Sequence, residues 1–255
     1  PGATDGFTVE AWINIESYTT DWMSIVDQNQ GDTCCTNRLW FGIYGPGRYF
    51  HVGTEKDTTD SPDISSNITV GTWAHVALTL AADGTNNLKI YINGTLFHQD
   101  TLTRWTTTNA NGFTIGTSTS GSYRFDGIFD NVKIWNAVLT QTQIQESRYA
   151  YGSEGVSGSP SLRAFYDFDE SSGTTVNDRT GNGYNLTISN TSGTPQDAFV
   201  SSTRIKAISY DNQSATVSHS GGSTTFNNGS TITSIPTTPP QKTNYTFAGW
   251  FTATS

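Results

Sequence analysis

The sequence predicts an all-β protein in which two antiparallel sheets form a sandwich, with one short helix. Short runs of alternating hydrophobic and polar residues recur at intervals of roughly 8 to 15 residues, with Gly, Asn and Asp between them. Only 14% of the 255 residues are charged, and stretches rich in Leu, Ala, Glu and Lys are almost absent. Because helices favour Leu, Ala, Glu and Lys, the near absence of such stretches is typical of short strands joined by polar turns.

Strict alternation predicts the strands of the first half of the chain. In FTVEAWINI (residues 7–15), the side chains of Phe, Val, Ala and Ile share one face. WAHVALTL (73–80) and LKIYI (88–92) alternate in the same way, and Asn93-Gly94 predicts a hairpin turn after the latter. Two more strands are predicted at residues 113–118 and 129–135.

The single helix and a second group of strands follow. Thr140 can accept a hydrogen bond as the N-cap of a short helix over residues 141–149. A connector rich in Gly, Ser and Pro then leads to LRAFYDFD (162–169) and NLTI (185–188), which are predicted to be strands.

The composition of the chain changes near residue 203, beyond which Ser and Thr are still more frequent. We therefore place a domain boundary there, with a sandwich domain over residues 1–203 and a small C-terminal β module over residues 204–255.

Charge and hydropathy exclude several classes of function. The net charge is −9 and no basic cluster occurs, so neither a nucleic acid nor an anionic membrane surface is an expected partner. No apolar run is long enough for a membrane span, so we expect no direct membrane insertion of this segment. The only cysteines, Cys34 and Cys35, are adjacent, and either a vicinal disulfide or two free thiols fits that spacing.

Several of these segments resemble one family. FTVEAWINI, GTWAHVALTLAADGTNNLKIYINGTL, FTIGTS and FDGIFDNVKIWNAVLTQTQIQE are similar to successive motifs of the laminin G-like, concanavalin A-like domain, over roughly residues 5–200. The resemblance implies a jelly-roll sandwich. YTFAGWFT (245–252) resembles the signature of the internalin B-type (Listeria–Bacteroides) repeat, which would be incomplete here. Together the two families imply a large modular bacterial protein that is extracellular or on the cell surface.

The loop DRTGNGYN (178–185) has two interpretations. Its Asn and Asp side chains can close a turn on the loop's own backbone, or its hard oxygens can bind a calcium ion. The family resemblance favours structural calcium, held by Asp178, Asn182 and Asn185. It implies Asp130 as their partner from an earlier strand, with Asp126 in reserve.

Aromatic residues suggest a ligand-binding surface. Flat rings flanked by polar groups are typical of sugar-binding surfaces, so the candidates are the aromatic residues and one arginine that fall in polar, loop-like segments: Trp22, Trp105, Tyr123 and Arg124. Trp40, Tyr44, Tyr49 and His51 are further aromatic residues of such segments. The alternative is that these rings pack between the sheets. Strand patterns assign the remaining tryptophans to cores, namely Trp12, Trp73, Trp135 and Trp250.

No catalytic constellation is recognisable in the sequence. Asp167 and Asp169 in YDFDE come nearest to an acid/base pair, but we interpret this segment as a scaffold strand. We therefore expect no enzyme. The expected function is that of a calcium-stabilised binding or adhesion module of a bacterial surface protein, with carbohydrate or glycoprotein and neighbouring domains of the same chain as partners. A structural stalk or fibre subunit, and an accessory module of a carbohydrate-active enzyme, are the alternatives.

Overall fold

The computed structural model describes most of the first two hundred residues and two short strands beyond them. The described residues are 6–28, 39–54, 58–81, 85, 87–103, 113–118, 121–170, 172–188, 205–207 and 225–227. The chain divides between Phe199 and Val200 into two units, and each is described by itself. Trp105, Trp250, Cys34 and Cys35 lie outside the described residues.

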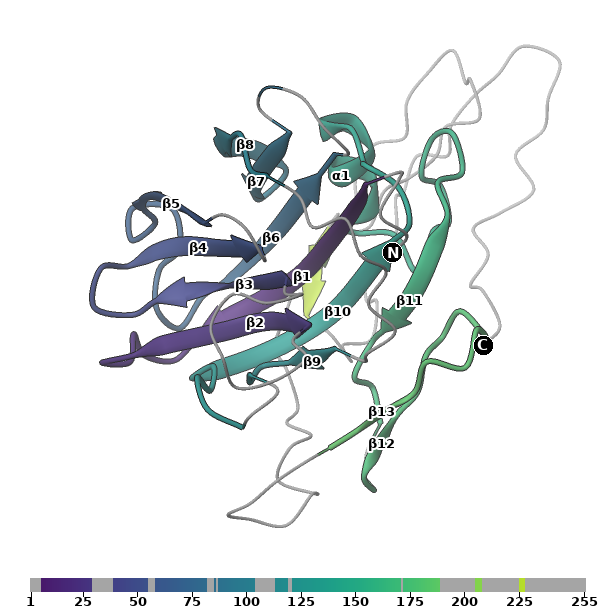
Figure 1. Ribbon diagram of the computed structural model, residues 1–255. Helices are drawn as coiled ribbons and strands as arrows, with labels where there is room; N and C mark the ends of the chain where they lie inside the picture. The colour runs from purple at the N-terminus through teal and green to yellow at the C-terminus, as the bar shows by residue number, and fades with distance from the viewer. Residues whose placement is uncertain are drawn as a thin grey trace, which may run out of the picture. The chain divides into compact units, whose positions relative to one another are not determined.

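One layer of the first unit is a six-stranded antiparallel sheet in the order β11-β10-β1-β6-β7-β8 (Figure 1). Its strands are β1 (Phe7–Ile15), β6 (Trp73–Leu80), β7 (Leu88–Ile92), β8 (Thr95–Asp100), β10 (Gly127–Trp135) and β11 (Leu162–Tyr166). The hairpin between β7 and β8 turns at Asn93 and Gly94, which both have a positive φ, as a two-residue hairpin turn requires.

The other layer is a five-stranded antiparallel sheet in the order β5-β4-β3-β2-β9. It consists of β2 (Trp22–Gln28), β3 (Leu39–Tyr44), β4 (Tyr49–Thr54), β5 (Thr58–Asp63) and β9 (Thr114–Ile115). The hydroxyl of Thr59 donates to the carboxylate of Asp100, which joins β5 to β8 at one side of the two layers.

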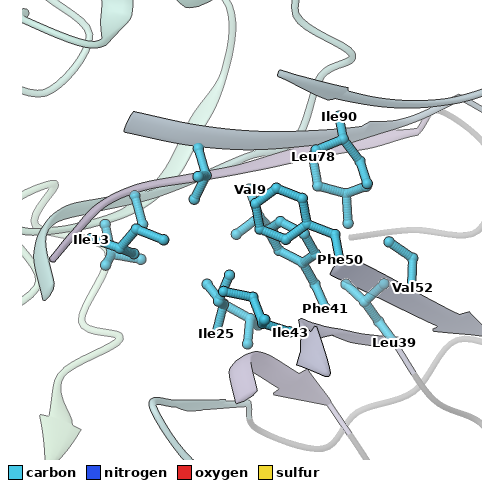
Figure 2. Packing of buried hydrophobic residues seen from close by; sticks show 14 of the residues in the cluster. Val9, Ile13, Ile25, Leu39, Phe41, Ile43, Phe50, Val52, Leu78 and Ile90 are labelled. Atoms are coloured by element: carbon cyan, nitrogen blue, oxygen red, sulfur yellow. The ribbon is translucent and has the colours of Figure 1, made fainter. Parts of the chain in front are cut away.

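The hydrophobic core lies between the two sheets (Figure 2). Val9, Leu78 and Ile90 project from the six-stranded sheet, and Phe41 and Phe50 project toward them from the five-stranded sheet. The rings of Phe41 and Phe50 have centroids 5.4 Å apart, and both are fully buried. Burial of each such side chain contributes roughly 1.5–3 kcal/mol, so this layer of apolar side chains is the main stabilising feature of the sandwich.

The outer side of the six-stranded sheet is covered by the helix α1 (Gln141–Ser147) and the segment after it. Thr140 caps the helix, and Thr140 and Gln143 form a reciprocal capping box. Below the helix, a second apolar cluster consists of Ala77, Tyr91, Trp135, Leu139, Ile144 and Val156.

A buried polar network joins this segment to the sheet. Glu10 and Lys133 face each other on β1 and β10, and each is 1% exposed. The Nζ of Lys133 donates to the carbonyls of Ser147 (2.6 Å) and Ala150 (2.9 Å) and lies 4.0 Å from a carboxylate oxygen of Glu10. Glu10 also accepts hydrogen bonds from Trp135 Nε1 and the Ser147 hydroxyl. The network thereby fixes the end of α1 on the sheet.

The remaining strands are short. The hairpin of β12 (Thr175–Val176) and β13 (Leu186–Thr187) follows β11, and in the second unit β14 (Ile205–Ala207) pairs with β15 (Thr225–Asn227). Among the residues that the structure describes, no helix is long and apolar enough to cross a membrane.

The predicted fold class, a sandwich of two antiparallel sheets with one short helix, is confirmed for the described residues of the first unit. Some predicted elements are shorter in the structure. The strand expected at 113–118 is limited to Thr114–Ile115, and the one expected at 162–169 ends at Tyr166, since Phe168 has a φ of 54° that no strand adopts. Trp12 and Trp135 are buried as expected, whereas Trp73 is only half-buried at the start of β6.

Candidate functional site

The outer side of the five-stranded sheet carries a group of aromatic side chains, which we call the aromatic face. It consists of Trp22 on β2, Trp40 and Tyr44 on β3, and Tyr49 and His51 on β4. Along β3, Leu39, Phe41 and Ile43 enter the core, so the alternate residues Trp40, Gly42 and Tyr44 point away from it. The sequence prediction placed these aromatic residues in loops, and this was wrong for all five.

Strand pairing aligns the rings across the sheet. Trp22 lies opposite Tyr44, and Tyr44 lies opposite Tyr49, so these three residues form a row across β2, β3 and β4. Ring centroids are 4.5 Å apart for Trp22 and Tyr44 and 5.3 Å apart for Tyr44 and Tyr49. Because the rings lie this close and are tilted, they support each other, and each presents only part of its surface to the outside.

Trp40 forms the floor of the aromatic face. It is 3% exposed, and its indole N–H donates to the hydroxyl of Ser24 at 2.7 Å. Gly42 is essential for this placement, because a Cβ there would overlap the Trp40 ring and the carbonyl of Met23. The half-buried Trp22 lies against Trp40 in an edge contact, with centroids 5.5 Å apart.

Polar groups flank the rings. Nδ1 of His51 lies 2.6 Å from Oδ1 of Asp60, its direct neighbour on β5. The Asp60 side chain is 52% exposed and that of His51 is 19% exposed, so both are within reach of a ligand. Burial and the nearby charge of Asp60 raise the pKa of Tyr49, so its hydroxyl stays protonated at neutral pH. Rings next to hydroxyl, imidazole and carboxylate groups can bind a molecule that has both apolar and hydroxyl-bearing sides.

Two of the other candidate residues lie at the β9 side of this sheet. The carbonyl of Tyr123 accepts a hydrogen bond of 2.8 Å from the backbone N–H of Ser24, which places Tyr123 beside β2, two residues from Trp22. Tyr123 is 37% exposed. Nε of Arg124 donates to the carbonyl of Gly121 in the same turn. The structure thus brings Trp22 and the backbone of Tyr123 together, whereas Trp105 lies outside the described residues.

The loop predicted to bind calcium is closed by its own hydrogen bonds. Oδ1 of Asp178 accepts from the backbone N–H groups of Phe165 (3.2 Å) and Thr180 (3.0 Å) and from the hydroxyl of Thr180 (2.8 Å). Oδ2 of Asp178 accepts from the N–H of Tyr184, and Oδ1 of Asn185 accepts from the N–H of Asp178. Burial alone would raise the pKa of Asp178, but these hydrogen bonds lower it.

Both carboxylate oxygens of Asp178 accept hydrogen bonds from N–H or O–H groups, and a calcium ion would need the same oxygens as ligands. The amide of Asn182 donates to the carbonyl of Arg163, and Asp130 lies on β10 opposite Trp12. Within the described ranges, no group of three or more His, Cys, Asp or Glu side chains is placed to hold a metal ion. The expected calcium therefore stays a prediction.

Two carboxylates of YDFDE, those of Asp167 and Glu170, are held by an arginine. Nε of Arg179 lies 2.9 Å from both carboxylate oxygens of Asp167, and its guanidinium is 3.4 Å from Glu170. Hydrogen bonding and charge from Asp167 raise the pKa of Arg179, so this ion pair persists at neutral pH. The contacts fit a scaffold role for the segment that carries Asp167.

Comparisons with solved structures find similar proteins. A protein from Bacteroides ovatus named for carbohydrate binding is 22% identical, with a TM-score of 0.52, and the match covers 70% of this chain and 50% of that one. Domain 4 of an extracellular arabinanase from Geobacillus stearothermophilus, in complex with arabinotriose, is 22% identical over 56% of this chain and 66% of that one, with a TM-score of 0.44. The CBM40 domain of a Ruminococcus gnavus sialidase, bound to sialyllactose, is 16% identical over 56% and 82%, with a TM-score of 0.45.

Sequence comparisons give a family but no individual relative. No curated protein matches the chain. The family match ends at residue 145, so the internalin B-type repeat expected after residue 203 stays a prediction. The sequence profile of the concanavalin A-like lectin/glucanases superfamily matches residues 2–145, more than half of the chain, and the chain therefore belongs to this superfamily.

Proposed function

We propose that this chain is a carbohydrate-binding module whose ligand lies on the aromatic face of the five-stranded sheet. The observation that carries the proposal is the row of partly exposed rings, Trp22, Tyr44 and Tyr49, beside the hydrogen-bonded pair of His51 and Asp60. The apolar side of a sugar ring can pack on aromatic carbon, while its hydroxyls exchange hydrogen bonds with the flanking polar groups.

The fold and its relatives support this proposal. The superfamily includes lectins by name, and the Bacteroides ovatus protein that shares the fold is named for carbohydrate binding. The match spans half of that protein's length. Any activity of a longer protein that contains this chain is therefore proposed as well. We propose that the module is non-catalytic, acts in adhesion, and belongs to a secreted or cell-surface bacterial protein.

Two alternatives place the same domain in another setting. As an accessory module of a carbohydrate-active enzyme it would bind sugar in the same way, next to a catalytic domain. As a stalk or fibre subunit it would bind none, and the aromatic face would serve only to stabilise the sheet.

The test is binding of a panel of neutral oligosaccharides, namely cellotetraose, xylotetraose, mannotetraose and arabinotriose, by isothermal titration calorimetry. We expect at least one to bind, and we expect Trp22→Ala to weaken that binding at least about tenfold, since one of the aromatic rings that contact the sugar is lost. Trp73→Ala, at a half-buried tryptophan of the other sheet, is the matched control and should bind normally. If the wild-type protein binds no member of the panel, the result would favour the stalk or fibre subunit over the carbohydrate-binding module.

Calcium is tested separately. Calcium added to chelated protein should raise the melting temperature if the ion binds at Asp178, Asn182, Asn185 and Asp130, because binding to the folded state alone stabilises it. An unchanged melting temperature at millimolar calcium would show that the hydrogen bonds of Asp178 already complete this loop.

A further inference from the structure

The hydrogen bond between His51 and Asp60 determines which ring nitrogen of His51 carries the proton. The two residues are cross-strand neighbours on β4 and β5, so the sheet register holds Nδ1 of His51 at 2.6 Å from Oδ1 of Asp60. An ionised carboxylate can only accept a hydrogen bond. Nδ1 must therefore carry the proton, and in the neutral imidazole Nε2 is left as an acceptor.

Among the described residues, the ring nitrogen of His51 that makes a hydrogen bond is Nδ1, which is bonded to Asp60. Trp22 and Trp40 contact the imidazole with centroids 4.9 Å and 5.5 Å away, but the indole N–H of Trp40 is already bonded to Ser24. The His51 side chain is partly exposed, so a bound molecule can reach it.

The groups that face His51 also determine what changes when it is protonated. Asp60 faces it from β5, the phenols of Tyr44 and Tyr49 lie nearby on β3 and β4, and β2 presents Trp22 and Ser24. The other acidic side chains of these strands, Asp27 on β2 and Asp63 on β5, lie opposite Trp40 and Tyr49. The strands β2, β3, β4 and β5 contain no Lys or Arg. Protonation of His51 keeps its bond to Asp60, but Nε2 changes from an acceptor into a donor.

From this geometry we propose that His51, oriented by Asp60, is a ligand-binding residue of the aromatic face, and that it accepts a hydrogen bond from a sugar hydroxyl only while neutral. The inference rests on the proposed function, because it assigns a role to one residue of that site. Its consequence is that carbohydrate binding weakens when the solution is acidified.

The experiment titrates the same four oligosaccharides at about pH 8 and about pH 5. For each member that binds wild type at the higher pH, we expect the affinity to fall about fivefold to tenfold at the lower pH, as for one lost hydrogen bond. His51→Phe keeps a ring but removes the acceptor, so it should bind weakly and equally at both values. His98→Gln, on β8 of the other sheet, is the matched control and should behave like wild type.

A second measurement tests the tautomer of His51 without any ligand. Long-range proton–nitrogen NMR spectra of the free protein at about pH 8 should show His51 with the proton on Nδ1 and with Nε2 unprotonated. The opposite tautomer, equal wild-type affinity at both pH values, or a His51→Phe variant that binds like wild type would overturn the inference and leave the proposed function standing. If wild type binds no member of the panel at about pH 8, the proposed function itself fails.

Discussion

Replacement of Lys133 by methionine should strongly destabilise the sandwich, although it keeps most of the side-chain volume. Lys133 is 1% exposed, and its ammonium group donates to two carbonyls of the segment after α1, those of Ser147 and Ala150. Methionine fills the space of the aliphatic stem, so little apolar packing is lost. The two carbonyls lose their donor, and Glu10 remains as a buried carboxylate without its nearest cation.

We expect a loss of about 3–5 kcal/mol in the free energy of unfolding, the range found when one partner of a buried ion pair is removed. Glu10→Gln combined with Lys133→Met should cost less than the single Lys133→Met change, because no unpaired charge then stays buried. Urea denaturation followed by tryptophan fluorescence measures both. Lys89→Met, at a half-buried lysine of β7, is the control and should stay within about 0.5 kcal/mol of wild type. A loss below about 1 kcal/mol for Lys133→Met would refute the reasoning.

Two further predictions concern the aromatic face and the response to acid. Gly42→Ala should cost about 1–3 kcal/mol in denaturation experiments and disturb Trp40 fluorescence, because the added Cβ overlaps both that ring and backbone. Gly53→Ala, where a Cβ would meet nothing closer than 3.6 Å, should be tolerated, and equal effects of the two changes would contradict this packing. Burial lowers the pKa of His75, and although burial would raise the pKa of Glu10, the hydrogen bond from His75 and the charge of Lys133 lower it. Both folded-state pKa values lie below the unfolded ones, so stability should decline as the pH falls below about 6.5 and again below about 4.5. Melting temperatures from pH 8 to pH 3 measure this, and a flat profile would show that neither group is linked to folding.

Alternation predicted the strands that have one apolar and one polar side. β1, β6, β7 and β10 were found this way, and so was the cap of α1 at Thr140, because their signals are local. The five-stranded sheet was largely missed. In LWFGIY of β3, inward Leu39, Phe41 and Ile43 alternate with outward Trp40 and Tyr44, so both sides are apolar and no alternation is visible.

The candidate site was only partly predictable for the same reason. Trp22 and the other rings were singled out as ligand candidates, but their gathering on one sheet depends on strand pairing between residues far apart in the sequence. The glycine that makes room for Trp40 has no sequence signal of its own. The sequence left the loop around Asp178 with two interpretations. The hydrogen bond that Asp178 accepts from the backbone of Phe165 depends on how the loop packs against β11, and local sequence does not show that packing.

The most direct test of carbohydrate binding at the aromatic face is an NMR titration of nitrogen-15-labelled protein with the neutral oligosaccharides. The indole N–H signals of Trp22 and Trp40 should shift as sugar is added, together with backbone signals of β2, β3 and β4. Shifts confined to the six-stranded sheet or to the loop at residues 178–185, with the two indole signals unmoved, would contradict the account.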